Sequence, residues 1–82
     1  AQIDGRYLID VRTKEEFGNG TLPGAVNIPV DNLRGRLGEI PTNRALAVFC
    51  QVGLRGYIAS RILKQSGFED VVNVKGGYSL AR

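Results

Sequence analysis

The sequence predicts a small α/β domain with a mostly parallel central sheet and helices on both faces. Short apolar runs alternate along the chain with segments of helical spacing, and this alternation is typical of parallel sheets. Several of the runs are apolar at successive positions, as in strands that are buried on both faces. With 82 residues, the chain is long enough for one domain only.

The first strand and helix are expected near the start of the chain. Residues 7–11 form a short apolar run, which predicts a buried strand. Thr13 and Glu16 then have the spacing of a capping box, in which each residue's side chain binds the other's backbone N–H. The helix that they start must be brief, because two glycines follow within residues 18–20.

A second strand and a longer helix follow. Residues 25–28 predict a strand that Pro29 ends, and Asp31 is expected to cap the next helix. The apolar face of that helix has i, i+4, i+7 spacing and consists of Leu33, Leu37 and Ile40.

The second half of the chain repeats the alternation. Residues 45–50 predict a strand, and a helix is expected after Gly56, with Gly67 as its left-handed C-terminal cap. Residues 71–74 form the last strand, and a turn over residues 75–77 leads into an unfinished helix. We therefore expect residues 1–82 to be a single domain, excised from a longer chain and truncated at both ends.

Composition excludes several classes of function. The net charge is +3 with scattered basic residues, which argues against nucleic-acid binding, and no apolar run is long enough to span a membrane. The single cysteine and the absence of histidine argue against metal sites and against nucleophiles activated by histidine. A single cysteine and no signal-peptide pattern indicate a cytoplasmic protein.

The candidate site is the loop from Cys50 to Gly56, which joins a buried strand to a helix. A thiolate at this junction faces the amino end of the helix and the backbone N–H groups of the loop, which stabilise anions. A free cysteine at a strand end is more often an inert core residue. The two glycines and Arg55 favour a reactive Cys50, because a cation at a helix amino terminus is unfavourable unless it faces an anion or a carboxylate. The predicted binding residues are Gln51, Val52, Gly53, Leu54, Arg55 and Gly56.

Two other strand ends are predicted to border this loop. Asp10 and Arg12 follow the first strand, and their more frequent role at such a position is a structural ion pair or cap. Gly76 and Gly77 are expected to be turn residues after the last strand, and Tyr78 either lines the pocket or packs against the core.

The spacing between Cys50 and Arg55 separates two kinds of chemistry. Cysteine-dependent phosphatases carry C-x5-R, whereas this chain has C-x4-R, with Gly56 at the sixth position after the cysteine. A loop that is one residue tighter should hold a single sulfur atom better than a tetrahedral phosphate. The spacing therefore favours sulfur chemistry.

The chain resembles the rhodanese family of sulfurtransferases. The matching segments run in the family's order over essentially the whole chain: residues 8–12, 16–17, 23–29, 50–56 and 76–78. The resemblance implies a rhodanese-like fold with Cys50 as the sulfur-accepting nucleophile. One departure is Thr21, since many family members have histidine at that position before the Pro-Gly-Ala turn.

Within the family, the catalytic loop is most similar to the rhodanese domain fused to FAD-dependent coenzyme A-disulfide reductases and related NAD(P)H-dependent persulfide or polysulfide reductases. The resemblance implies that FAD and NAD(P)H belong to the missing part of such a protein, and that this domain needs no cofactor or metal.

The predicted function is transfer of sulfane sulfur as a persulfide on Cys50. The donor is thiosulfate, a polysulfide or a persulfide, and the acceptor is a thiol such as coenzyme A or glutathione. Two alternatives remain open at this point: a non-catalytic interaction or regulatory module, and a cysteine-dependent phosphatase-like enzyme.

Overall fold

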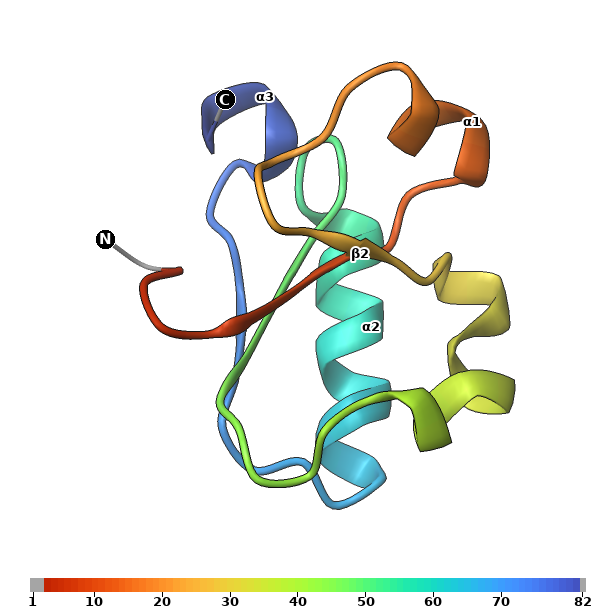
Figure 1. Cartoon of the computed structure of the whole chain (residues 1–82), viewed down its shortest axis with the longest axis vertical. Helices are drawn as coiled ribbons and strands as arrows, with labels where there is room; N and C mark the ends of the chain where they lie inside the picture. Colours follow the sequence, from red (N-terminus) through yellow and green to blue (C-terminus); the bar gives the residue numbers. More distant parts are fainter. Residues whose placement is uncertain (1–2, 82) are drawn as a thin grey trace.

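A computed structural model of the chain describes residues 3–81 and shows a parallel sheet with helices packed around it (Figure 1). The four strands lie in the order β2-β1-β3-β4, and every neighbouring pair is parallel. The elements in chain order are β1 (Tyr7–Asp10), α1 (Lys14–Gly18), β2 (Val26–Asn27), the 3₁₀-helix η1 (Val30–Glu39), β3 (Leu46–Phe49), α2 (Leu54–Gln65), β4 (Val71–Asn73) and α3 (Gly77–Ala81). The predicted fold class is confirmed, while residues 1, 2 and 82 of the predicted domain lie outside the described residues.

The parallel arrangement brings the carboxyl ends of the strands to one edge of the sheet. In register, Ile9 of β1 pairs with Val26 of β2 and with Val48 of β3, and Val48 pairs with Asn73 of β4. At this edge, the top of Figure 1, α1, the loop after β3 and α3 come together. Ligands of open parallel sheets bind at such an edge.

Alternation along the strands divides the core between the two faces of the sheet. Ile9 and Val48 belong to one apolar cluster, which α2 and η1 cover. Leu8 and Phe49, their neighbours in sequence, belong to a second cluster, on which Tyr78 of α3 packs. Cys50 follows the alternation and belongs to the first cluster, so its side chain lies on the face that α2 covers.

The capping box at the start of α1 is confirmed. The backbone N–H of Glu16 donates to Thr13 Oγ1 over 3.1 Å, and the backbone N–H of Thr13 donates to Glu16 Oε1 over 3.1 Å. The helix ends at Gly18, as the glycines predict.

The predicted α-helix after Asp31 is wrong in type. Residues 30–39 form a 3₁₀-helix with a kink at Arg36, whose φ is −122°, and the capping position is Pro29, without a side-chain hydrogen bond. Gly35 and Gly38 lower the stability of a regular α-helix over this stretch, and short 3₁₀ segments result. The apolar face is nevertheless correct, because Leu33, Leu37 and Ile40 all pack on the first cluster.

The end of α2 follows the prediction closely. Gly67 has φ +101°, the backbone N–H of Phe68 donates to Leu63 O over 3.0 Å, and that of Gly67 donates to Lys64 O over 3.2 Å. These two bonds define a Schellman motif, which requires a left-handed residue after the helix.

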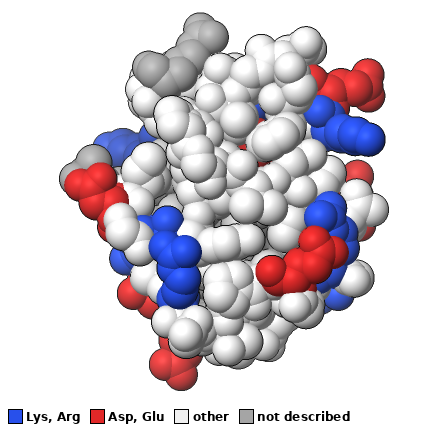
Figure 2. Space-filling view, in the orientation of Figure 1, with Lys and Arg blue, Asp and Glu red and all other residues white. Residues whose placement is uncertain are grey.

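The surface carries charges of both signs. On the face shown in Figure 2, acidic and basic side chains lie around the margin, and uncharged residues fill the middle. Among residues 3–81, the longest helices are too short and too polar to cross a lipid bilayer.

Replacing Gly67 by alanine should destabilise the fold through backbone strain alone. A Cβ atom at Gly67 meets no atom within 4 Å, so the cost comes from its positive φ and should be about 1–2 kcal/mol of unfolding free energy. Gly38→Ala is the matched control, because its Cβ also meets nothing and its φ is not left-handed. Urea denaturation measures both variants, and an equal loss in the two would contradict the strain argument.

Candidate functional site

The candidate site forms where the segments after β1, β3 and β4 meet. The backbone N–H of Val11 donates to Phe49 O over 3.0 Å, and the backbone N–H of Tyr78 donates to Cys50 O over 2.7 Å. The N–H of Ser79 donates to Gln51 O over 3.1 Å. The loop after β3 is therefore held between the end of β1 and the start of α3, as the sequence predicts.

Cys50 lies at the centre of this arrangement, with 1% of its surface exposed. Its Sγ accepts a hydrogen bond from the backbone N–H of Gly53 over 3.0 Å. The side chains of Val52 and Leu54 point outward, each 69% exposed. Backbone rather than side chains of the loop therefore faces the sulfur.

The helix after the loop begins earlier than predicted. α2 starts at Leu54, with Gly53 as its capping residue at φ +128°, a conformation that favours glycine. The N–H groups of Leu54, Arg55 and Gly56 occupy the first turn, where helical N–H groups have no partner within the helix. Gly56 lies inside the helix, where a Cβ atom would come within 2.2 Å of Asn73 Oδ1, so close packing and not an unusual dihedral requires glycine there.

Arg55 forms a bidentate ion pair with Glu16. Arg55 Nη1 lies 2.7 Å from Glu16 Oε1, and Nη2 lies 3.1 Å from Oε2. The pair lowers the pKa of Glu16 to about 2, mainly through the hydrogen bonds from Arg55 and with a further contribution from Thr13. The pKa of Arg55 is raised, first by the hydrogen bonds with Glu16 and, to a smaller extent, by the charges of Glu16, Cys50 and Asp10.

Sequence reasoning assigned Glu16 only to the helix cap. The prediction that Arg55 faces an anion or a carboxylate is confirmed, and the carboxylate is that of Glu16. The only signal for a partner was the unfavourable position of a cation in the first turn of a helix.

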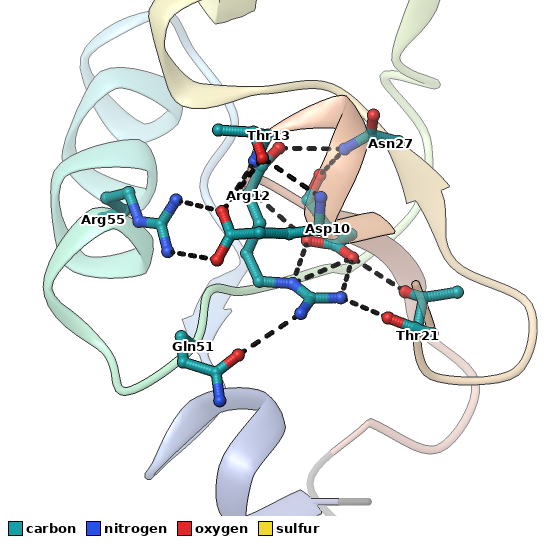
Figure 3. A network of polar contacts seen from close by, with 9 residues as sticks. Asp10, Arg12, Thr13, Thr21, Asn27, Gln51 and Arg55 are labelled. Carbon is teal, nitrogen blue, oxygen red and sulfur yellow. Dashed lines mark hydrogen bonds and ion pairs between the residues drawn. The ribbon is translucent and has the colours of Figure 1, made fainter. Parts of the chain in front are cut away.

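A buried polar network supports the loop from the second face of the sheet (Figure 3). Asp10 is fully buried and Arg12 is 3% exposed, and their side chains are joined by several hydrogen bonds, the shortest 2.8 Å. Arg12 also donates to Gly20 O over 2.6 Å and to Gln51 Oε1 over 3.3 Å. Its pKa is raised, mainly by the hydrogen bond with Asp10. The structure thus favours the structural role for this pair, with one direct link to the loop.

Two further residues join this network. Thr21 Oγ1 donates to Asp10 Oδ2 over 2.8 Å, so the hydroxyl that stands where many relatives of the family have histidine anchors the buried carboxylate. The ring of Tyr78 lies 4.3 Å from the guanidinium carbon of Arg12. Tyr78 therefore packs against the network rather than standing free at a pocket mouth, and no pattern in the sequence indicated either contact.

Gly76 and Gly77 form the turn into α3, as predicted. Both have positive φ, and a Cβ atom at Gly77 would lie 2.3 Å from Cys50 O. The missing side chain at Gly77 lets α3 approach the loop closely. Among residues 3–81, no three residues of the types His, Cys, Asp and Glu gather in a way that could hold a metal ion.

Comparisons with known proteins agree with this architecture. The family model described as "Rhodanese-like domain" matches residues 1–80. A sulfurtransferase from Allochromatium vinosum is 37% identical over 77 residues, which cover 94% of this chain and 72% of the relative.

Two solved structures extend the comparison to longer proteins. Reduced Bacillus anthracis CoADR-RHD, a CoA-disulfide reductase with a rhodanese domain, is similar with a TM-score of 0.87 and 46% identity, over 94% of this chain and 14% of that one. An NAD-dependent persulfide reductase from A. fulgidus is similar with a TM-score of 0.77 and 42% identity, over 90% of this chain and 13% of that one. The predicted likeness to the rhodanese domains of these reductases is confirmed.

The Glu16–Arg55 pair should make stability depend on pH in a defined window. Because the pKa of Glu16 is lowered in the folded state from 4.5 to about 2, the pair stabilises the fold above pH 4.5 and its contribution disappears as the pH falls toward 2. Both side chains are 34% exposed, so solvent screening limits the contribution to about 0.5–1 kcal/mol at pH 7.

Glu16→Gln tests this expectation, because glutamine keeps the capping box and removes the charge. The difference in unfolding free energy between the native protein and the variant should shrink between pH 4.5 and 2.5 in urea titrations. Glu69→Gln is the control, since Glu69 is exposed and has no hydrogen bond or ion pair with residues 3–81. A pH-independent difference would contradict the role of the ion pair.

Proposed function

The chain belongs to the rhodanese-like domain family, and we propose that it transfers sulfane sulfur as a persulfide on Cys50. The single observation that carries this proposal is the setting of the Cys50 sulfur. It accepts the N–H of Gly53 over 3.0 Å at the amino end of α2, and the first turn of that helix also carries Arg55. A sulfur anion is stabilised by both features.

In the first step, the Cys50 thiolate attacks the outer sulfur of a donor such as thiosulfate. A bond forms between Cys50 Sγ and the outer sulfur while the donor's own sulfur–sulfur bond breaks, and sulfite leaves with the electron pair of that bond. The persulfide anion stays on Cys50, and total charge is conserved. The N–H of Gly53, which donates to Sγ, and the N–H groups of the first turn of α2 would then stabilise the terminal sulfur of the persulfide.

Arg55 is suited to orient an anionic donor in this step. Its guanidinium has five N–H groups, of which two are directed at Glu16 by the observed bonds. The remaining N–H groups are available for an oxyanion of the donor, while the pair with Glu16 fixes the plane of the guanidinium. Polysulfides and low-molecular-weight persulfides are donors of the same chemistry.

In the second step, a thiol acceptor removes the sulfur. Coenzyme A, glutathione or a cysteine of a parent enzyme would serve, and the exchange itself needs no metal or organic cofactor. The likeness to CoADR-RHD and to an NAD-dependent persulfide reductase supports a parent reductase. In that parent, FAD and NAD(P)H would bind outside this domain, and the single cysteine favours a reducing, cytoplasmic setting.

Two alternatives give different experimental results. A cysteine-dependent phosphatase would hydrolyse an aryl phosphate and would not accept sulfur from thiosulfate. A non-catalytic rhodanese-like module would do neither, although it would have the same fold as a catalytic domain.

Mass spectrometry after exposure to thiosulfate tests the proposal directly. We expect a gain of one sulfur atom that cyanide removes and that Cys50→Ser does not acquire. Absence of an adduct from thiosulfate, polysulfide and glutathione persulfide would overturn the proposal. A persulfide that also formed on Cys50→Ser would show that the sulfur is carried elsewhere.

Replacing Arg55 by glutamine should slow the loading of Cys50. Loss of one partly exposed charged contact to the donor predicts a fall of about tenfold in the loading rate with thiosulfate. Arg61→Gln is the matched control, because Arg61 lies on the same helix and its observed side-chain partner is Tyr57. Equal loading rates in Arg55→Gln and the native protein would exclude the donor-orienting role.

A further inference from the structure

A cavity of about 430 Å³ opens beside the sulfur loop, and of its lining residues only Arg55 has a role in the steps described above. Its size falls within the range of about 300–1,000 Å³ that is usual for small-molecule sites. The buried apolar side chains of Val11 and Ile62 form its floor, and the partly exposed Ile58 also lines it. The rest of the lining consists of Thr13, Pro29, Val30 and three charged residues from η1 and α2: Asp31, Arg34 and Arg55.

The cavity lies on the same face of the sheet as the Cys50 sulfur. Val11 and Ile62 line the cavity and also belong to the apolar cluster that includes Cys50. Arg55 connects the two places, since it lines the cavity and lies two residues after Gly53, whose N–H donates to Cys50 Sγ. A molecule seated in the cavity would therefore lie next to the loop that carries the sulfur.

Two side chains of opposite charge at the cavity, Asp31 and Arg34, form no ion pair with each other or with other described residues. Within residues 3–81, the side chains of Asp31 and Arg34 are exposed and form no hydrogen bond or ion pair. Arg55, in contrast, is paired with Glu16. The rim thus offers one available carboxylate and one available guanidinium, three residues apart on η1.

These features fit a zwitterionic ligand better than a polyanion. A guanidinium binds a carboxylate with directed hydrogen bonds, and an aspartate binds an ammonium group. The apolar floor suits the carbon chain between the charged end and a reactive group. A polyanionic ligand bound by Arg34 would lie beside the uncompensated carboxylate of Asp31, which is unfavourable.

We propose that this cavity binds the acceptor of the second step, a peptide thiol whose far end carries both an ammonium and a carboxylate group. Arg34 binds the carboxylate and Asp31 binds the ammonium group, while the thiol reaches the outer sulfur on Cys50. The inference rests on the proposed function, because it assigns a site to its acceptor.

The transfer step conserves atoms and electrons. The acceptor thiol first gives its proton to the Cys50 persulfide anion. The resulting acceptor thiolate forms a bond to the outer sulfur as the bond from that sulfur to Cys50 Sγ breaks. The acceptor leaves as a persulfide with the proton, and the Cys50 thiolate is regenerated. No external oxidant or reductant is required.

Modified glutathiones and two variants test the assignment together. Glutathione carries both charges at one end, glutaryl-Cys-Gly lacks that ammonium group, and γ-aminobutyryl-Cys-Gly lacks that carboxylate. Each protein is first loaded with sulfur to completion, and kcat/KM of the acceptor step is then measured for the three thiols. The variants are Asp31→Asn and Arg34→Gln, and Lys64→Gln on the exposed far end of α2 is the charge-matched control.

Each variant should lose sensitivity to one group only. In the native protein, removal of either group should lower kcat/KM about three- to tenfold, the range of one partly exposed charged contact. Arg34→Gln should abolish the effect of the missing carboxylate, and Asp31→Asn that of the missing ammonium group, whereas Lys64→Gln should retain both effects. The assignment is overturned if removal of either group changes kcat/KM by the same factor in the native protein and in all three variants.

A binding measurement separates this inference from the proposed function. S-methylglutathione cannot accept sulfur, and in ¹⁵N-resolved NMR titrations it should shift the amide signals of Val30, Arg34 and Ile58 with a smaller response in Arg34→Gln. Shifts confined to other regions would refute the cavity as its site. If Cys50 never acquires sulfur, the proposed function fails, and the titration still decides the binding site by itself.

Discussion

The buried ion pair of Asp10 and Arg12 is the interaction on which the geometry of the site depends. Both side chains are removed from water, and such a pair is stable only when its remaining hydrogen-bonding groups are also satisfied. Here Thr21 donates to the carboxylate, and the guanidinium donates to Gly20 O and to Gln51 Oε1. The cost of burying two charges is thereby offset by bonds that tie two loops to the end of β1.

The sheet separates the buried network around Arg12 from the Cys50 sulfur. The Arg12 network packs with Phe49 and Tyr78 on one face, whereas Cys50 points toward the face that α2 covers. The loop backbone lies between them. Gln51 joins it to Arg12 on one face of the sheet, and the first turn of α2 continues it on the other face. Among residues 3–81, the sulfur therefore accepts the backbone N–H of Gly53, and no titrating side chain forms a hydrogen bond with it.

Local signals in the sequence were sufficient for much of the fold. The capping box of Thr13 and the left-handed cap at Gly67 depend on neighbours within a few residues, and both were predicted correctly. The 3₁₀ geometry of η1 was missed, because the spacing of Leu33, Leu37 and Ile40 is that of an α-helix, whereas the structure brings these residues to one cluster across a kink at Arg36.

The contacts that shape the site are non-local, and this is why sequence reasoning recovered only part of it. The position of Cys50 at a strand end followed from the apolar run before it. The pairing of Arg55 with Glu16 joins residues 39 apart in sequence, and that of Thr21 with Asp10 depends on where a loop returns to the sheet.

Because a cation in the first turn of α2 opposes the helix dipole, the Glu16 carboxylate is what allows Arg55 to remain there. The pair is close to neutral as a whole, so Arg55 can be positioned near Cys50 without a large excess of positive charge. Recognition of a donor must then rely on the directed N–H groups that Glu16 leaves available, and such recognition is selective for the shape of an anion as well as for its charge.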